Sequence, residues 1–472
     1  MMPSRSMSIS FARRVAFEVL RRVEAEGGYA SDLLHARLGE KKIGPTPPRA
    51  TRDRDAALAT ELTLGVLRWQ RLLDFLVEKH TKKPVRDMDV EVRLALRLGI
   101  YQLRFLTRVP ARAAVDESVE LVKKYGKRSA AGLVNAVLRR VAAEQERKKG
   151  HLEKLTLAEK MPVADRLGIE WSHPSWMVER WVEQYGEKRT IALLATNNRA
   201  PRFNCSVDEG GRVEEIATEL RKSGMKVEAG RWLRAALTVR GGNPAETEAF
   251  RRGEISIQDE ASQMAGRLVG ARKGEHVLDL CAAPGGKTIT LARQVGTTGW
   301  VVAADRHRQR LSAMREQLRR VGAGGVALVT LDGTERLPFR ETFDRVLVDA
   351  PCSGTGTLAR NPEIRWRLKP EDLRDFHGRQ VKLLSNALEQ LKPGGRVVYS
   401  TCSLEPEENE QVVEDVLELR SDVRRVSGRE ELRPHLENAG AVKELFDRKG
   451  DFRTFPPEHG TDGFFAAVLE RD

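Results

Sequence analysis

From residue 275 onward, short apolar segments alternate with helical segments in this chain. The apolar segments read HVLDLCA, GWVVAAD, GVALVTLD, FDRVLVDA and GRVVYST. Strands that alternate with helices are typical of a parallel, doubly wound sheet, because each crossover helix returns the chain to the same edge. Ligands of such sheets bind beyond the carboxyl ends of the strands. The alternation therefore predicts an α/β fold and the place of its functional site.

The chain has 472 residues, more than one sheet domain needs, so we expect further domains. The first third is predicted to be all-helical because its apolar residues recur every three or four positions. These residues are Leu58, Leu62, Val66, Trp69, Leu73 and Leu76, followed by Val92, Leu96, Ile100 and Leu103. We interpret these stripes as core faces and not as sites.

The middle of the chain mixes helical stretches such as SWMVERWVEQYG with strand-like runs such as PRFNCSV, and predicts a small α+β module. Before it, the stretch AAEQERKKGHLEK loses apolar periodicity and is mostly charged, which is typical of a linker. The predicted boundaries are 1–145 for the helical domain, 146–164 for the linker, 165–265 for the module and 266–472 for the sheet domain.

The charge balance favours an anionic partner. Lys and Arg number 81 against 68 Asp and Glu, which gives a formal net charge of +13. A basic surface lowers the free energy of approach to phosphates, so nucleic acid is the first partner to consider. The opening MMPSRSMSISFARRVAFEVL has no apolar run suited to secretion or membrane spanning, so we expect a cytoplasmic protein without membrane contact.

The four cysteines form no CxxC pair and no histidine-bracketed spacing, so we expect reduced thiols and no metal site. Cys205 lies in an apolar run and is interpreted as a core residue, and Cys281 is also expected to pack. Cys352 and Cys402 differ, because each follows the carboxyl end of a strand. We expect both thiols to lie over the same crevice.

The first strand of the sheet runs into DLCAAPGGKT (279–288), which has the features of a ligand-binding loop. Gly285 and Gly286 let the backbone turn tightly and approach a ligand, and the helix that follows offers free amide donors. The spacing is not that of a Walker loop, and the G-x-G-x-x-G of nicotinamide enzymes is absent.

The next three strands each close with an aspartate, at Asp305, Asp332 and Asp349. S-adenosylmethionine needs a ribose acceptor, a partner for the adenine edge and a cradle for its methionine part. Asp305, Asp332 and the two glycines can supply these in turn. One such aspartate would be interpreted as a helix cap, but three on successive strands favour a donor site.

Two thiols near a methyl donor suggest covalent catalysis at carbon 5 of a pyrimidine. A thiolate that adds to carbon 6 makes carbon 5 enamine-like, the methyl group transfers, and loss of the carbon 5 proton expels the thiol. Asp349 is expected to hydrogen-bond the base edge and to protonate ring nitrogen 3. One cysteine attacks and the second assists release.

Three stretches, LDLCAAPGGKT, DAPCSGTGTLARNPEIRW and YSTCSLEPEENE, resemble the signature motifs of the RNA cytosine-5 methyltransferase family. The resemblance implies that Cys402, in the T-C-S motif, is the nucleophile and that Cys352, in the P-C-S motif, helps release. It implies a Rossmann-like domain that binds S-adenosyl-L-methionine. The implied donor-binding residues are Cys281, Ala282, Ala283, Pro284, Gly285, Gly286, Lys287, Asp305, Asp332 and Asp349.

The stretches ATELTLGVLRWQRLLDFLV and AGLVNAVLRR of the first third resemble the RNA-binding domain named after antitermination factor NusB. This domain order is typical of the bacterial 16S ribosomal RNA cytosine-5 methyltransferases, which implies 16S ribosomal RNA as the partner. We also expect a monomer. Residues 425–455 match no motif that we can name.

Two other functions stay open. A pure RNA-binding or antitermination factor would leave the loop, the aspartates and both thiols unexplained. A transfer-RNA cytosine-5 methyltransferase shares the catalytic motifs, and only the appended domain argues against it. In LARNPEIRWR (358–367), Arg360, Asn361 and Arg365 are expected to face RNA. For Arg367, a position in a solvent-exposed turn and helix start is nearly as good an interpretation as a contact with RNA.

Overall fold

The chain divides into two compact units in the computed structural model. The first unit comprises Met1–Arg199 and Leu358–Arg367, and the second comprises Ala200–Thr357 and Leu368–Asp472. The described residues are 9–39, 49–147, 161–208, 212–340 and 342–472. None of the helices within these ranges is long and apolar enough to cross a membrane.

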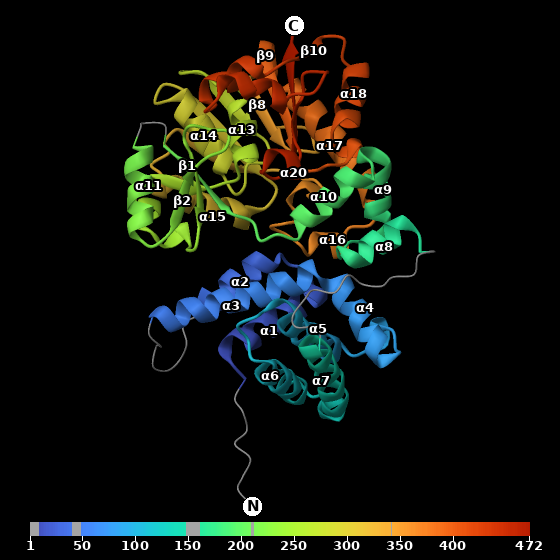
Figure 1. Cartoon of the computed structure of the whole chain (residues 1–472). Coiled ribbons are helices and arrows are strands. Elements are labelled where there is room, and N and C mark those ends of the chain that lie inside the picture. Colours follow the sequence, from blue (N-terminus) through green and yellow to red (C-terminus); the bar gives the residue numbers. More distant parts are fainter. Residues whose placement is uncertain (1–8, 40–48, 148–160, 209–211, 341) are drawn as a thin grey trace, which may run out of the picture. The chain divides into compact units, whose positions relative to one another are not determined.

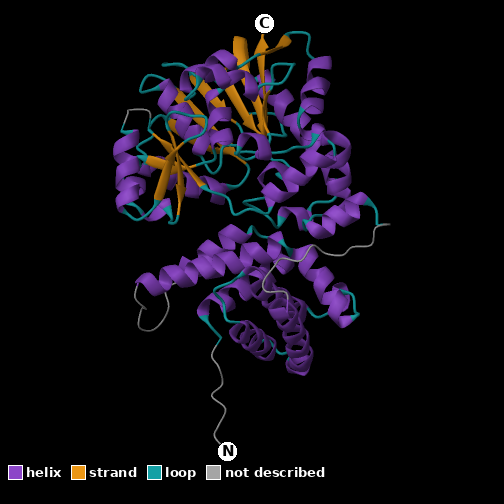
Figure 2. Cartoon of the chain, in the orientation of Figure 1, coloured by secondary structure: helices purple, strands orange, loops and turns teal. Residues whose placement is uncertain are grey.

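The described part of the first unit contains helices and no strand, as Figure 2 shows. Its longer helices are α1 (Phe11–Glu26), α2 (Ala30–Gly39), α3 (Arg49–Arg68), α4 (Gln70–Thr81), α5 (Val90–Phe105), α6 (Ala111–Lys124), α7 (Ala131–Arg147), α8 (Val163–Glu170), α9 (Ser175–Tyr185) and α10 (Glu187–Asn197). The predicted apolar stripes lie in its core, where Leu62, Leu73 and Leu96 are fully buried. The prediction of a helical amino-terminal domain is confirmed.

The two compact units group the elements differently from the predicted domains, whose boundaries remain predictions. Helices α8 to α10, which we expected at the start of the α+β module, belong to the first unit. Arg71 on α4 explains this, because its guanidinium donates to the His173 carbonyl at 2.6 Å and to Ser175 Oγ at 2.8 Å. Residues 148–160 of the predicted linker lie outside the described residues.

A small antiparallel sheet opens the second unit (Figure 1). Its strands β1 (Phe203–Val207), β2 (Lys226–Ala229), β3 (Ala236–Arg240) and β4 (Ile255–Ile257) lie in the order β2-β3-β1-β4. Helices α11 (Val213–Lys222) and α12 (Glu248–Arg251) accompany it. Cys205 on β1 is fully buried in this core, which confirms its structural role, and burial raises its pKa to about 12.

The large sheet contains the five predicted strands, joined by parallel pairing. They are β5 (His276–Asp279), β6 (Trp300–Asp305), β7 (Val326–Thr330), β8 (Phe343–Asp349) and β9 (Leu391–Thr401). Helices α13 (Glu260–Arg267), α14 (Gly286–Val295), α15 (Arg308–Arg320), α17 (Asp372–Glu389) and α18 (Glu410–Glu418) accompany them. The order β9-β8-β5-β6-β7 reverses at β5 and β8, which is where such sheets bind ligands.

An antiparallel extension beyond β9 was not predicted. The strand β12 (Phe464–Arg471) pairs with β9, and β10 (Val423–Val426) and β11 (Phe452–Thr454) pair with β12. Most of the unmatched residues 425–455 connect β10 to β11, so they help to build this edge of the sheet.

Candidate active site

Two neighbouring parallel strands bring the predicted catalytic thiols together. Asp349 on β8 lies opposite Ser400 on β9, and Ser400 Oγ donates a hydrogen bond to Asp349 Oδ1 at 2.9 Å. Because both strands end here, the chain reaches Cys352 and Cys402 at the same edge of the sheet. Their Sγ atoms lie 3.3 Å apart, and both cysteines are free and half-buried.

The surroundings of Cys352 favour its protonated form. Its hydrogen bond with Cys402 and its burial raise the pKa of Cys352 well above the ordinary thiol value, and the nearby Glu408 charge adds to the effect. A thiol that keeps its proton can donate it in the sulfur–sulfur hydrogen bond. Either sulfur can be the donor of this hydrogen bond, and Cys352 is the thiol whose surroundings favour keeping the proton.

The loop after β5 closes against the end of β6. Asp305, which is only 5% exposed, accepts the Ala283 N–H at 3.2 Å through Oδ2 and the His307 N–H at 2.8 Å through Oδ1. Gly285 has a φ of +107°, and a Cβ there would lie 2.8 Å from Met314 Cγ, so a side chain cannot be accommodated without a shift. Burial raises the pKa of Cys281, as expected for a packed thiol.

Asp332 follows β7 on the other side of β6. Its Oδ1 accepts the Thr334 hydroxyl at 2.7 Å and the Thr334 N–H at 3.0 Å, and these bonds lower its pKa. Arg306 Nε lies 3.6 Å from Oδ2. Asp305 and Asp332 therefore stand as fixed acceptors at the ends of β6 and β7, and Asp305 contacts the loop after β5.

Lys287 links the loop after β5 to Asp349. Its Nζ lies 2.8 Å from Asp349 Oδ2 and 2.8 Å from Ser262 Oγ, and it stands over the Phe464 ring at 4.9 Å from the centroid. The sequence placed Lys287 only in the donor-binding set. Ser262, on α13, was missed, because no motif surrounds it.

Asp279 was also missed, although it lies inside the motif quoted for the loop. Its side chain is buried, Thr288 Oγ1 donates to Oδ2 at 2.5 Å, and Oδ1 has no hydrogen-bond partner. Burial raises the pKa of Asp279 to about 7. A buried unpaired acceptor below a glycine loop, flanked by further carboxylates, fits S-adenosylmethionine, which carries a sulfonium and an ammonium group.

Replacing Asp279 with asparagine is expected to remove a pH dependence of stability. The pKa of Asp279 is about 7 in the folded chain against an ordinary 3.8, so the folded state binds more protons between these values. This group therefore lowers the free energy of unfolding as pH rises from about 4 to about 7, with no further change above. Urea unfolding of the wild type and Asp279→Asn across this range measures the difference, with the exposed Asp375→Asn as control. If the difference in free energy of unfolding between the wild type and Asp279→Asn did not change with pH, the raised pKa of Asp279 would be contradicted.

The structure corrects one of the three predicted RNA contacts. Arg365 is fully buried within the first unit, and its guanidinium donates to backbone and amide oxygens instead of facing solvent. Its acceptors are the carbonyls of Arg68, Ser172, Asn197 and Leu358, and Asn198 Oδ1, at 2.9 to 3.4 Å. Arg360 and Asn361 are half-buried and remain predictions.

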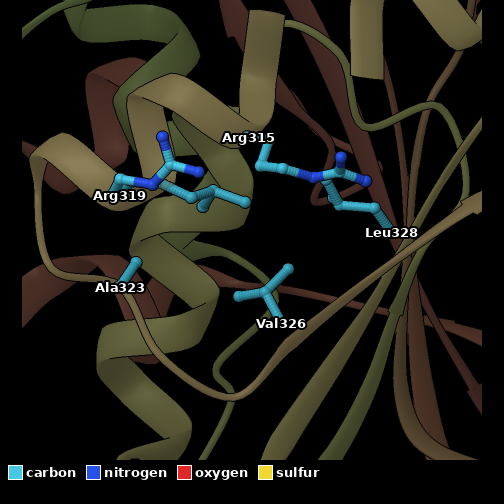
Figure 3. Close-up of a pocket in the computed structure, with 6 residues that line it drawn as sticks. Arg315, Arg319, Ala323, Val326 and Leu328 are labelled. Carbon is cyan, nitrogen blue, oxygen red and sulfur yellow. The ribbon is translucent and has the colours of Figure 1, made fainter. Parts of the chain in front are cut away.

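A groove of about 350 Å³ lies between α15 and β7 (Figure 3). It is lined by Arg315, Leu318, Arg319, Ala323, Val326 and Leu328. None of these residues belongs to the predicted donor-binding set. Among the described residues, no cluster of His, Cys, Asp or Glu side chains could hold a metal ion.

Family models match three parts of the chain. The model for 16S rRNA methyltransferase RsmB/F matches residues 267–470, and that for the NusB family matches residues 10–143. The model for the ferredoxin-like domain of RsmF/B-like methyltransferases matches residues 173–246. The matches follow the predicted order of a helical domain, a small module and a catalytic sheet.

Whole-chain comparisons agree with these matches. The "Probable ribosomal RNA small subunit methyltransferase B" of Synechocystis sp. is 33% identical over 466 residues, covering 98% of this chain and 99% of the relative. The Bacillus subtilis protein of the same name is 31% identical over 471 residues, covering 98% and 100%. The crystal structure of PH0851 covers 98% of this chain and 100% of its own, with a TM-score of 0.80 and 25% identity. The chain therefore belongs to the RsmB/F family of 16S rRNA methyltransferases, enzymes that depend on S-adenosylmethionine.

Proposed function

We propose that this protein methylates carbon 5 of a cytosine in 16S ribosomal RNA through a covalent bond between Cys402 and the base. The observation that carries the proposal is the pair of sulfur atoms 3.3 Å apart at the ends of β8 and β9, beside the donor loop. Methylation of a more nucleophilic atom would need no thiol pair at this place. The names of the relatives support small-subunit ribosomal RNA as the substrate.

The two thiols have unequal tasks in this mechanism. Cys402 adds to carbon 6 as a thiolate, forming the C–S bond, and Cys352 retains its proton because of its raised pKa. After carbon 5 has taken the methyl group, its proton leaves to a base, the 5,6 double bond re-forms and the C–S bond breaks. The Cys352 thiol then stabilises the departing Cys402 thiolate by donating a hydrogen bond to it.

Asp349 and Lys287 exchange a proton with ring nitrogen 3 of the cytosine. When carbon 6 is attacked, negative charge develops toward ring nitrogen 3, which takes up a proton. Asp349 Oδ2 is ion-paired with the Lys287 ammonium at 2.8 Å, so the ammonium can pass a proton to Asp349, which donates it to ring nitrogen 3. Ser400 fixes the carboxylate through its other oxygen. The same proton returns to the pair when the aromatic base re-forms.

S-adenosylmethionine supplies an electrophilic methyl group when it is bound. Asp305 would accept the ribose hydroxyls, Asp332 would serve the adenine edge, and the loop from Cys281 to Lys287 would hold the methionine part. Each Asp305 oxygen accepts one backbone bond in the structure and keeps a further lone pair for a ribose hydroxyl.

Replacing Asp305 with alanine is expected to weaken binding of S-adenosylmethionine by about 1–3 kcal/mol, because both ribose hydroxyls lose their acceptor. Isothermal titration calorimetry measures the affinity. The matched control is Asp375→Ala, an exposed aspartate on α17 of the same unit. Equal affinities of the two variants would contradict the assignment of Asp305.

The substrate is tested with purified protein, tritiated S-adenosylmethionine and separate transcripts of 16S ribosomal RNA and of transfer RNA. The proposal predicts label in the 16S transcript, recovered as 5-methylcytidine after digestion to nucleosides. Label in transfer RNA alone would show that the protein is a transfer-RNA methyltransferase and would contradict 16S ribosomal RNA as the substrate. Label in another nucleoside would contradict the cytosine-5 chemistry.

A further inference from the structure

A buried glutamate lies between the loops that carry the two thiols. Glu408 stands just before α18, and its side chain is fully inaccessible to solvent. Its carboxylate receives hydrogen bonds from Ser353, which follows Cys352, and from Ser403, which follows Cys402. One side chain therefore holds the neighbours of both cysteines.

Both carboxylate oxygens of Glu408 are in use. Oε1 accepts the Ser353 N–H at 2.7 Å and the Gln380 amide at 3.1 Å. Oε2 accepts the Ser403 hydroxyl at 2.5 Å and also the Ser353 hydroxyl. The two serine Oγ atoms lie 3.1 Å from each other, so the carboxylate closes a compact network across the two loops.

The backbone around Glu408 reinforces the same junction. The Tyr399 hydroxyl donates to the Glu408 carbonyl at 2.6 Å, and the neighbouring Asn409 accepts the Thr401 hydroxyl at 2.5 Å. The Gly356 N–H donates to the Cys402 carbonyl at 2.9 Å. These bonds hold the Glu408 backbone in place and tie the two loops together, so the carboxylate is presented to Ser353 and Ser403 from a fixed position.

We propose that Glu408 is a positioning residue that sets the separation of the Cys352 and Cys402 sulfur atoms through Ser353 and Ser403. It touches neither reacting sulfur directly. The role rests on the proposed function, in which both thiols act on one cytosine. Neither the composition of the chain nor the spacing of its cysteines points to this residue.

The arrangement requires a carboxylate and not merely a polar side chain. An ionised carboxylate accepts all four of these hydrogen bonds through its two oxygens. A carboxamide accepts hydrogen bonds only at its oxygen, because its nitrogen is a donor. In Glu408→Gln the amide nitrogen would face the Ser353 N–H or the serine hydroxyls, so at least part of the network must rearrange. Loss of the charge also removes one cause of the high pKa of Cys352.

The first experiment measures thiol reactivity without RNA. Iodoacetamide labelling of Cys352 is followed by mass spectrometry as a function of pH in Glu408→Gln and in Glu418→Gln, an exposed glutamate on α18. We expect the Cys352 profile to move to lower pH in Glu408→Gln and to stay at the wild-type position in Glu418→Gln. Coincident profiles would overturn the proposal, because a residue needed only for folding leaves the reactivity of the folded fraction unchanged.

The second experiment measures turnover and covalent capture of RNA. Misplacing the pair should lower kcat by about 10- to 100-fold in Glu408→Gln, with little change in the KM for RNA. RNA-linked enzyme should accumulate as in Cys352→Ala, and combining both substitutions should add nothing further. A fall in active fraction alone, with normal kcat per folded enzyme and no adduct, would contradict the role.

Two further variants keep the test decisive. Ser403→Ala and Ser353→Ala each remove one donor to Glu408, and weaker shifts in the same direction are expected even if Glu408→Gln folds poorly. If Cys352→Ala itself captures no RNA, the proposed function has failed, while the labelling profiles still decide the role of Glu408. If Cys352→Ala captures RNA and the Glu408 and serine variants behave as wild type, only the positioning role has failed.

Discussion

Cys402→Ser is expected to abolish methyl transfer, lowering kcat by more than about 10³-fold, because this sulfur must form the bond to carbon 6. A serine hydroxyl lacks the nucleophilicity of a thiol, whose ordinary pKa near 8.5 is within reach of activation. No RNA-linked species should form. Binding of S-adenosylmethionine should be unchanged, which separates lost chemistry from lost folding.

Cys352→Ala is the paired test. Attack by Cys402 and methyl transfer should remain possible while elimination of the Cys402 thiol slows. The covalent enzyme–RNA adduct should therefore accumulate. The species would appear as a slow, nuclease-sensitive band on a denaturing gel, dependent on the methyl donor and absent from the Cys352/Cys402 double variant. Capture that required Cys352 and survived replacement of Cys402 would reverse the two roles.

Arg365→Ala is expected to cause the second large effect, a local destabilisation of the helical unit by about 3 kcal/mol. The buried guanidinium binds four carbonyls and one amide oxygen, and burial lowers its pKa to about 9. Its removal leaves buried acceptors unpaired. Trp366 beside it donates to the Leu67 carbonyl at 2.7 Å, so α3 and α10 should lose protection together.

Amide hydrogen exchange of the whole chain measures this effect. Exchange in α3 and α10 should quicken by about 100-fold in Arg365→Ala, while the large sheet exchanges at the wild-type rate. Arg374→Ala, on the exposed face of α17, is the matched control. Equal protection in both variants would mean that Arg365 does not stabilise the unit.

The sheet domain could be predicted because its signals are local. The central parallel strands β5, β6, β8 and β9 are largely buried and read as apolar runs, whereas the edge strand β7 is partly exposed. The strand ends mark the ligand edge, as Asp305 and Asp349 do. The meeting of Cys352 and Cys402 follows from two strands that end side by side, so the sequence was sufficient to expect it. The helical domain was predictable for a similar reason, since its apolar stripes repeat with the helical period.

The features that the sequence did not predict depend on distant partners. Arg365 looks like a surface arginine in a polar stretch, yet four of its five acceptors belong to residues more than 150 positions away. Glu408 lies in the acidic run EPEENE, where nothing distinguishes the buried carboxylate from its neighbours. The antiparallel strands β10 to β12 were missed because pairing with β9 is decided by the tertiary fold and not by local periodicity.

Bisulfite sequencing of total RNA tests the central claim most directly, because 5-methylcytosine resists conversion and unmodified cytosine does not. Cells with the wild-type protein are compared with cells that lack it and with cells that carry Cys402→Ser. The account predicts one cytosine in 16S ribosomal RNA that is protected only by the wild-type protein. Protection that disappeared from transfer RNA instead, or a 16S pattern identical in all three strains, would contradict it.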